Sequence, residues 1–268
     1  MTFQCASTLE FGSEQVAIAV RPGLLGSHLG IAYSAHGKRH LLHLAFHKLL
    51  LNDPYPPPVG EWAAKVIDLP PIAASQLVAL LMAIAPKKNG LPYGINLIAG
   101  MGAINEMGEY VPQSNSDGYT CSSFIAELLR KIAFPLIRLD SWMSNNESIL
   151  WGEAVVCLLK AYGVSAEHVD LVEKNNNGLR LRPEEVAAAA EMPAVKRPAT
   201  QDMIKARAPV LMEEVRAICH PASHAPPSMQ PCIDAYVSGL AAIAATSNTT
   251  PIGAAAPLDG GAATDMKV

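Results

Sequence analysis

The chain contains one cysteine whose local sequence predicts a reactive thiol. Cys121 follows a glycine-rich stretch, 100–118, and opens an amphipathic run. The apolar residues of that run recur at helical spacing: Phe124, Ile125, Leu128, Leu129 and Ile132. We therefore expect Cys121 at a helix N-terminus, where backbone N–H groups and the helix dipole favour the nucleophilic thiolate. A free cysteine is more commonly an inert core residue, but the glycine-rich loop before Cys121 and the small residues after it favour a reactive role.

A nucleophilic cysteine needs a base to accept its proton and a third polar group to orient that base. His28 begins an apolar run, 28–33, that is typical of a strand, and it is the first candidate for the base. The run 39–46 predicts the partner strand and carries His40 and His43. These two are three residues apart and point to opposite faces of a strand, so only one of them can orient His28. Cys121 and His28 together suggest a cysteine hydrolase.

Two groups of metal-ligand residue types offer alternatives. The first is a set of histidines spaced as on one face of a helix, where neighbouring imidazoles can share an ion: His36, His40, His43 and His47. The second lies near the C-terminus and combines thiols with imidazoles: Cys219, His220, His224 and Cys232. The strand-like pattern argues against the first, and the second matches no common zinc spacing cleanly. We predict no metal ion and no cofactor.

The surrounding segments predict how the candidate residues are positioned. Short runs rich in branched and aromatic residues predict a small antiparallel sheet: 14–21, 28–34, 39–46 and 64–69. The proline-rich stretch 53–58 predicts an extended connection. Helices are expected from about Ser75, which can cap the first of them, and further along the chain: 75–85, 121–132, 146–162, 166–174, 183–191 and 201–218.

These elements divide the chain into three predicted parts. Residues 1–163 form the first part, the catalytic domain, which contains the sheet, the helix that begins at Cys121 and the candidate catalytic residues. Residues 164–245 form a helical appendage. Residues 246–268 are rich in alanine and glycine with little apolar bulk, so we expect a disordered tail.

Composition narrows the partners and the location. The 268 residues carry a formal net charge of −4, which provides no basic surface for nucleic acid or for an anionic membrane. We find no secretory signal and no transmembrane segment, so the sequence predicts a cytoplasmic protein, with export by a signal-independent route left open. Five cysteines without tight spacing predict reduced thiols rather than a disulfide framework.

The candidate residues resemble a known family, the circularly permuted NlpC-type papain-like hydrolases, which include the lecithin-retinol acyltransferase relatives. In that family a strand beginning with histidine carries the base, the next strand carries a second histidine, and the nucleophilic cysteine follows at a helix start. Here the corresponding segments are 28–33, 41–44 and 119–124. The resemblance covers about residues 26–129. It implies an α+β fold with a permuted papain-like antiparallel sheet, and it favours His43 over His40 as the orienting residue.

The resemblance also implies a mechanism. Cys121 would attack a carbonyl carbon, His28 would accept the thiol proton and later protonate the leaving group, and His43 would hold the His28 ring. Because Cys121 lacks the Asn-Cys-Glu-His context of the acyltransferases, we expect a peptidase or amidase acting on a peptide or peptidoglycan-like substrate. The alternatives are a lipid acyltransferase or phospholipase, and an inactive binding or regulatory protein with the same fold. The substrate, the side chain that would stabilise the oxyanion and the oligomeric state do not follow from the sequence.

Overall fold

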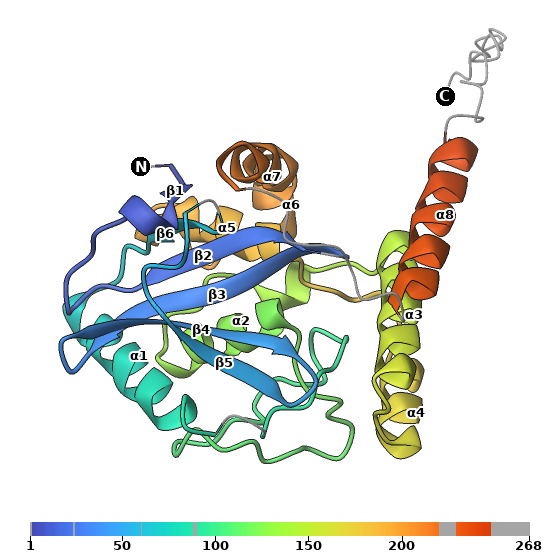
Figure 1. Cartoon of the computed structure of the whole chain (residues 1–268), viewed down its shortest axis with the longest axis horizontal. Helices are drawn as coiled ribbons and strands as arrows, with labels where there is room; N and C mark the ends of the chain where they lie inside the picture. Colours follow the sequence, from blue (N-terminus) through green and yellow to red (C-terminus); the bar gives the residue numbers. More distant parts are fainter. Residues whose placement is uncertain (1, 24, 60, 88–89, 220–228, 248–268) are drawn as a thin grey trace, which may run out of the picture.

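The computed structural model describes residues 2–23, 25–59, 61–87, 90–219 and 229–247. It has a mixed α+β architecture in which helices surround a twisted antiparallel sheet (Figure 1). The strands are β1 (Gln4–Cys5), β2 (Ala17–Gly23), β3 (Gly26–Ala35), β4 (Lys38–Phe46), β5 (Leu49–Pro54) and β6 (Ala63–Val66). The α-helices are α1 (Pro71–Ile84), α2 (Cys121–Lys131), α3 (Asn146–Ala161), α4 (Ala166–Lys174), α5 (Pro183–Glu191), α6 (Gln201–Lys205), α7 (Arg207–Ile218) and α8 (Gln230–Ser247).

The sheet has the strand order β1-β6-β2-β3-β4-β5, and each neighbouring pair is antiparallel. The runs predicted as strands correspond to β2, β3, β4 and β6. The sequence reasoning missed β5, because it took the prolines from Pro54 onward as the start of an unpaired connection. Pro54 instead ends β5, opposite His40. Since β5 is an edge strand, a proline without an N–H donor is tolerated there.

The two faces of the sheet have different covers. One face contributes Leu29, Ile31 and Tyr33 of β3 to the main hydrophobic core, which also contains residues of α1, α2, α5 and α7. The opposite face carries a smaller cluster, covered by the N-terminal segment and by aromatic side chains. Its members are Ala6, Leu9, Phe11, Ala17, Ala19, Ala32, Leu41, Tyr55, Trp62 and Ala64. Alternation of side chains along each strand produces this division.

The segment expected to be a helical appendage, 164–245, packs closely on the sheet. Helices α5 and α7 both contact β2, and the residues from Val186 to Ala190 are buried in the main core. The boundary expected at residue 163 therefore does not separate two hydrophobic cores. The tail expected at 246–268 lies outside the described residues except for its first two positions, which belong to the end of α8.

Two helix boundaries differ from the expectation because of proline. Helix α1 begins at Pro71 rather than at a Ser75 cap, and proline suits the first helical position because its fixed φ is helical and its missing N–H is not needed there. The helix expected at 201–218 is divided at Ala206 into α6 and α7. Pro209 cannot donate a hydrogen bond to the Lys205 carbonyl, which breaks the α-helical ladder at that point.

The expectation of uniformly reduced cysteines is wrong. Cys157 of α3 and Cys232 of α8 form a disulfide bond, while Cys121 and Cys219 are free thiols. The bond joins two helices that lie against one another. It also removes Cys232 from the alternative zinc group, whose two histidines, His220 and His224, lie outside the described residues.

Candidate active site

Helix α2 begins at Cys121 because Thr120 caps it. The Thr120 side chain accepts a hydrogen bond from the Ser123 N–H at 3.0 Å, and the Ser123 hydroxyl accepts one from the Thr120 N–H at 2.9 Å. This reciprocal arrangement is a capping box with serine at the third helical position. It places Cys121 at the first helical position, where the backbone N–H has no acceptor within the helix.

The loop that precedes α2 holds the cap in place by close backbone packing. Gly118 has φ +109°, and a Cβ atom there would lie 2.2 Å from the Pro92 carbonyl oxygen, so a side chain at this position is excluded. The neighbouring Asp117 is fully buried and accepts a hydrogen bond from the Ile95 N–H at 3.2 Å. Burial raises the pKa of Asp117 to about 6, against hydrogen bonds from the backbone of Ile95 and Asn96.

The structure joins His28, His43 and Asp53 in one hydrogen-bonded chain. His28 Nε2 lies 2.9 Å from His43 Nδ1, and His43 Nε2 lies 3.0 Å from Asp53 Oδ2. The three residues come from consecutive strands, β3, β4 and β5. The His43 side chain is 3% exposed, whereas the Asp53 side chain is 53% exposed. The chain therefore runs from the solvent at Asp53 through a buried imidazole to His28.

The direction of these hydrogen bonds assigns the protons. A carboxylate only accepts, so His43 donates from Nε2 to Asp53, and a neutral His43 then accepts at Nδ1. His28 donates from Nε2 to that acceptor, which leaves an unprotonated lone pair on His28 Nδ1. Burial lowers the pKa of His28 well below its usual value, with further lowering by His43 and Arg21, and burial also lowers the pKa of His43. His28 is therefore a neutral base.

Trp62 and Arg21 surround the two imidazoles. The Trp62 ring centroid lies 5.5 Å from that of His28 and 5.3 Å from that of His43. Arg21 stands opposite His28 in the β2–β3 register, and its guanidinium lies over Trp62 at 4.7 Å from the ring centroid. The indole and the cation help to keep both imidazoles uncharged.

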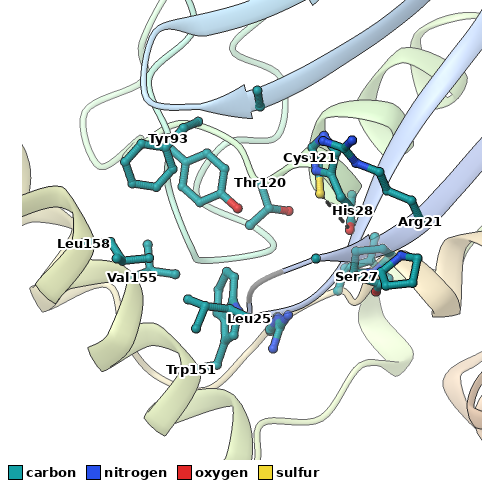
Figure 2. Close-up of a pocket in the computed structure, with 18 of the residues that line it drawn as sticks. Arg21, Leu25, Ser27, His28, Tyr93, Thr120, Cys121, Trp151, Val155 and Leu158 are labelled. Carbon is teal, nitrogen blue, oxygen red and sulfur yellow. Dashed lines mark hydrogen bonds between the residues drawn. The ribbon is translucent and has the colours of Figure 1, made fainter. Parts of the chain in front are cut away.

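Cys121 and His28 line the same pocket, which has a volume of about 500 Å³. Figure 2 shows Cys121 and His28 at one end of it and Trp151, Val155 and Leu158 of α3 at the other. The wall is formed by β2, β3, the end of β4, the start of α2 and α3. Its lining residues are Arg21, Pro22, Gly23, Leu25, Ser27, His28, Ala45, Phe46, Tyr93, Thr120, Cys121, Ser122, Trp151, Val155, Leu158, Tyr162, Arg180, Leu181, Pro183 and Met229.

The pairing register of β3 and β4 bears on how the start of α2, with Cys121, comes to share a pocket with His28 of β3. Pairing between β3 and β4 begins at Ile31 and Leu42, so residues 26–30 of β3 do not continue that ladder. Ala45 and Phe46, at the irregular end of β4, line the pocket with Cys121.

The Cys121 thiol is held in the neutral form in the free protein. Cys121 is 4% exposed, and burial raises its pKa, against the backbone N–H of Leu29, the Ser122 side chain and the charge of Arg180, which lower it. Sγ lies 3.9 Å from Ser122 Oγ, and within the described residues no hydrogen bond joins Sγ to the His28 ring. Burial therefore outweighs the lowering of the Cys121 pKa that the helix N-terminus is expected to produce.

The remaining histidines do not form the alternative metal site. His40 and His43 belong to strand β4, so the four-histidine helix does not exist. His40 stacks on Tyr33 with ring centroids 5.3 Å apart, away from His28. His47 pairs with His168 of α4 at a centroid distance of 4.4 Å. Among the described residues no group of three or more histidine, cysteine or acidic side chains is arranged to hold a metal ion.

Sequence reasoning missed three charged residues of the site. Asp53 was assigned to a connection, although the apolar run from Leu49 to Leu51, only two residues after the 39–46 run, is a hairpin signal. Arg21 is placed by its register opposite His28. Arg180 follows α4 and reaches the pocket only through the tertiary fold, and no local pattern marks it.

Comparison with protein-family models, with curated proteins and with solved structures finds no match to this chain. The geometry of the site must therefore carry the functional argument. In the described part of the chain, no helix combines the length and apolar character that crossing a membrane requires.

Proposed function

We propose that the protein is a cysteine hydrolase, a peptidase or amidase that cleaves an amide bond in a peptide-containing substrate. One observation carries the proposal: a capped helix presents Cys121 to a pocket that also contains His28, a neutral imidazole held through His43 by Asp53. A nucleophile, a base and a group that orients the base are the three parts that thiol hydrolysis needs.

The proposed reaction begins with a neutral thiol and a neutral imidazole. Cys121 Sγ attacks the amide carbonyl carbon as its proton passes to His28 Nδ1, and the backbone N–H of Cys121 stabilises the oxyanion. His28 then gives the proton to the leaving nitrogen, the C–N bond breaks, and a thioester remains. Water attacks the thioester with His28 again as base, the C–S bond breaks, and the released acid leaves a protonated thiol.

The order of the elements supports a permuted papain-like arrangement. The strand with His28 comes first, the strand with His43 is its neighbour, and the helix with Cys121 follows both and packs against them. The His43 imidazole, rather than His40, meets His28. The family likeness stays a proposal, resting on this order and on the hydrogen-bonded pair.

The disulfide bears on where the protein acts. Disulfides persist in oxidising compartments and are rare in the cytosol. The Cys157–Cys232 bond therefore argues against the cytoplasmic location expected from the sequence and favours an oxidising compartment. A peptide of the cell wall is a substrate that such a location would offer.

Digestion of isolated cell walls and of short peptides, followed by mass spectrometry, tests the proposal. We expect new amine and carboxyl termini with the unaltered protein and none with Cys121→Ala. Cys219→Ala, which removes a free thiol that does not line the pocket, is the matched control and should keep the activity. Equal product from the unaltered protein and Cys121→Ala would refute the proposed nucleophile.

A lipid acyltransferase or phospholipase is the second candidate. The apolar side chains of Leu25, Phe46, Val155, Leu158 and Met229 in the pocket favour it, since they would suit an acyl chain. Release of fatty acid from phospholipid vesicles, lost in Cys121→Ala, would support this branch. Its absence together with peptide cleavage would support the amidase.

A further inference from the structure

The pocket contains a buried arginine that the proposed chemistry does not use. Arg180 is 8% exposed, and it lines the same pocket as Cys121 and His28. Its guanidinium carbon lies 3.6 Å from the centroid of the Trp151 ring, which is a close stack. Stacking covers one face of the guanidinium and leaves its edge, which carries the N–H donors, available for other contacts.

That guanidinium lacks the partners that a buried charge requires. Arg180 Nε is fully buried without a hydrogen bond, and within the described residues Arg180 forms neither a hydrogen bond nor an ion pair. Glu184 is the anion that acts on it most strongly, but the Glu184 carboxylate accepts a hydrogen bond from the Ser27 hydroxyl and is not ion-paired to Arg180. Arginine stays protonated even when burial lowers its pKa. A buried cation of this kind is costly unless a ligand completes it.

Arg180 lies at the Trp151 end of the pocket, beside the start of the strand that carries His28. A Cβ atom on Gly26, two residues before His28, would be 3.9 Å from Arg180 Nη2. The charge of Arg180 also acts on the Cys121 thiol. Between and around these residues the wall is largely apolar, with Leu25, Val155 and Leu158 among its members.

We propose that Arg180, stacked on Trp151, binds a carboxylate of the substrate, so that the enzyme acts on acidic peptides or N-acyl amino acids with an apolar portion. That the ligand is a substrate rests on the proposed function, whereas the anion site itself rests on the geometry of the pocket. Arg180 is then a specificity-determining residue that anchors the substrate while Cys121 and His28 act on a nearby amide.

The negative charge beside Arg180 favours a carboxylate over a phosphate. A carboxylate is planar, carries one negative charge and pairs with the edge of one guanidinium through two hydrogen bonds. A phosphate monoester carries nearly two negative charges at neutral pH. Glu184 already contributes a negative charge beside Arg180, so the second charge of a phosphate would be opposed.

Binding to the full-length Cys121→Ala protein tests the site without turnover. Two probes carry a carboxylate: N-acetyl-leucine has a terminal carboxylate, and the α-amide of N-acetyl-glutamic acid has a side-chain carboxylate. N-acetyl-leucinamide has no carboxylate, and phenyl phosphate tests a phosphate in its place. We expect at least one carboxylate probe to bind roughly 10- to 100-fold more tightly than the uncharged amide in isothermal calorimetry. Whichever carboxylate probe binds more tightly identifies the terminal or the side-chain carboxylate as the group recognised.

Variants assign the preference to Arg180. In the Cys121→Ala background, Arg180→Met should remove the preference for the acid, and Arg180→Lys should keep part of it, because lysine retains the charge but not the planar fork. Arg39→Met is the matched control, since Arg39 pairs with Glu10 outside the pocket, and it should change nothing. Thermal unfolding shows whether each variant is folded. If the Arg180 variants do not fold, the comparison of acid and amide binding to the Cys121→Ala protein still tests the site.

Several results would overturn the anion site. They are equal binding of acids and amide, no binding by either acid, tighter binding of phenyl phosphate than of both acids, and an acid preference that survives in a folded Arg180→Met protein. The two proposals fail separately. Acid binding without peptide cleavage removes only the hydrolase, and cleavage with no preference for acidic substrates removes only the carboxylate site.

Discussion

His43 accepts a hydrogen bond from His28 and donates one to Asp53: its Nδ1 lies 2.9 Å from His28 Nε2, and its Nε2 lies 3.0 Å from Asp53 Oδ2. Because one nitrogen of each neutral ring must be a donor and the other an acceptor, the two bonds determine the tautomer of both imidazoles. The nitrogen that remains free to act as a base is His28 Nδ1. The candidate site therefore contains a hydrogen-bonded chain from Asp53 through His43 to His28, and His28 shares its pocket with Cys121.

This order predicts graded losses of activity. His28→Ala should lower kcat/KM by roughly 10²- to 10⁴-fold, the usual contribution of a general base. His43→Ala should cost less, because the base remains but its orientation and tautomer are released. His40→Ala is the matched control on the same strand and should leave kcat/KM unchanged. Steady-state kinetics on a cleaved peptide would measure all three, and equal losses in His40→Ala and His43→Ala would contradict the assignment.

The lowered histidine pKa values predict the acid limb of the pH profile. A base works in its neutral form, and burial lowers the pKa of His28 below its ordinary value of 6.5. As the pH falls, kcat/KM should therefore hold until the pH is below 6.5 and only then decline. A decline centred at or above 6.5 would show that His28 is not the group that titrates.

The raised thiol pKa predicts slow alkylation at neutral pH. Burial raises the pKa of Cys121 above its ordinary value of 9.0, so the thiolate fraction should increase only at higher pH. The rate of iodoacetamide labelling at Cys121, followed by peptide mass spectrometry, should rise with a midpoint above 9. A midpoint near neutrality would instead indicate a standing thiolate and imidazolium pair.

Asp117 predicts a pH effect on stability. The pKa of Asp117 is about 6 in the folded protein, against an ordinary value of 3.8. Between these two pH values Asp117 is mainly protonated in the folded protein and ionised in the unfolded chain. The contribution of Asp117 to the unfolding free energy is greatest below the lower value and falls by roughly 2 to 3 kcal/mol as pH rises through the upper one. Asp117→Asn should remove this fall.

Urea unfolding of the unaltered protein and of Asp117→Asn at pH 4 and pH 7.5 would measure the effect. Between pH 4 and pH 7.5 the unfolding free energy of the unaltered protein should fall relative to that of Asp117→Asn. Asp202→Asn, a change at an exposed residue of α6, is the control. A constant difference at both pH values would exclude Asp117 as the source.

The disulfide predicts a redox effect on stability and on the pocket. Cys157 and Cys232 are 75 residues apart in the chain, and a cross-link of that span stabilises by about 4 kcal/mol in the chain-entropy description. Reduction should lower the unfolding free energy by up to that amount. Because Met229 and Leu158 line the pocket beside the two cysteines, reduction should also weaken ligand binding.

The double variant Cys157→Ser/Cys232→Ser is the control for the reductant. It should match the reduced protein and show no further change when dithiothreitol is added. Denaturant midpoints with and without dithiothreitol measure both. If dithiothreitol leaves the denaturant midpoint of the unaltered protein unchanged, the disulfide bond does not stabilise the packing of α8.

Much of the site could be predicted from local sequence. The strand of His28, the strand of His43 and the helix start at Cys121 each follow from short patterns: alternation, a turn between two runs, and an amphipathic run after a capping threonine. These patterns are local because hydrogen bonding and side-chain alternation within a strand or helix involve residues a few positions apart. The resemblance implied the α+β class, and the structure has a mixed α+β architecture.

Other features depended on contacts between distant segments. Asp53 joins the histidines because β5 pairs with β4, a pairing that the prolines from Pro54 onward made hard to predict. Arg180 enters the pocket through the packing of the chain after α4. Cys157 meets Cys232 only because α8 packs against α3. The same holds for the Cys121 thiol, whose pKa depends on burial. The sequence by itself determined which residues can act, through local periodicity, whereas tertiary structure decided their partners, their protonation and their solvent exposure, since these depend on packing between segments far apart in the chain.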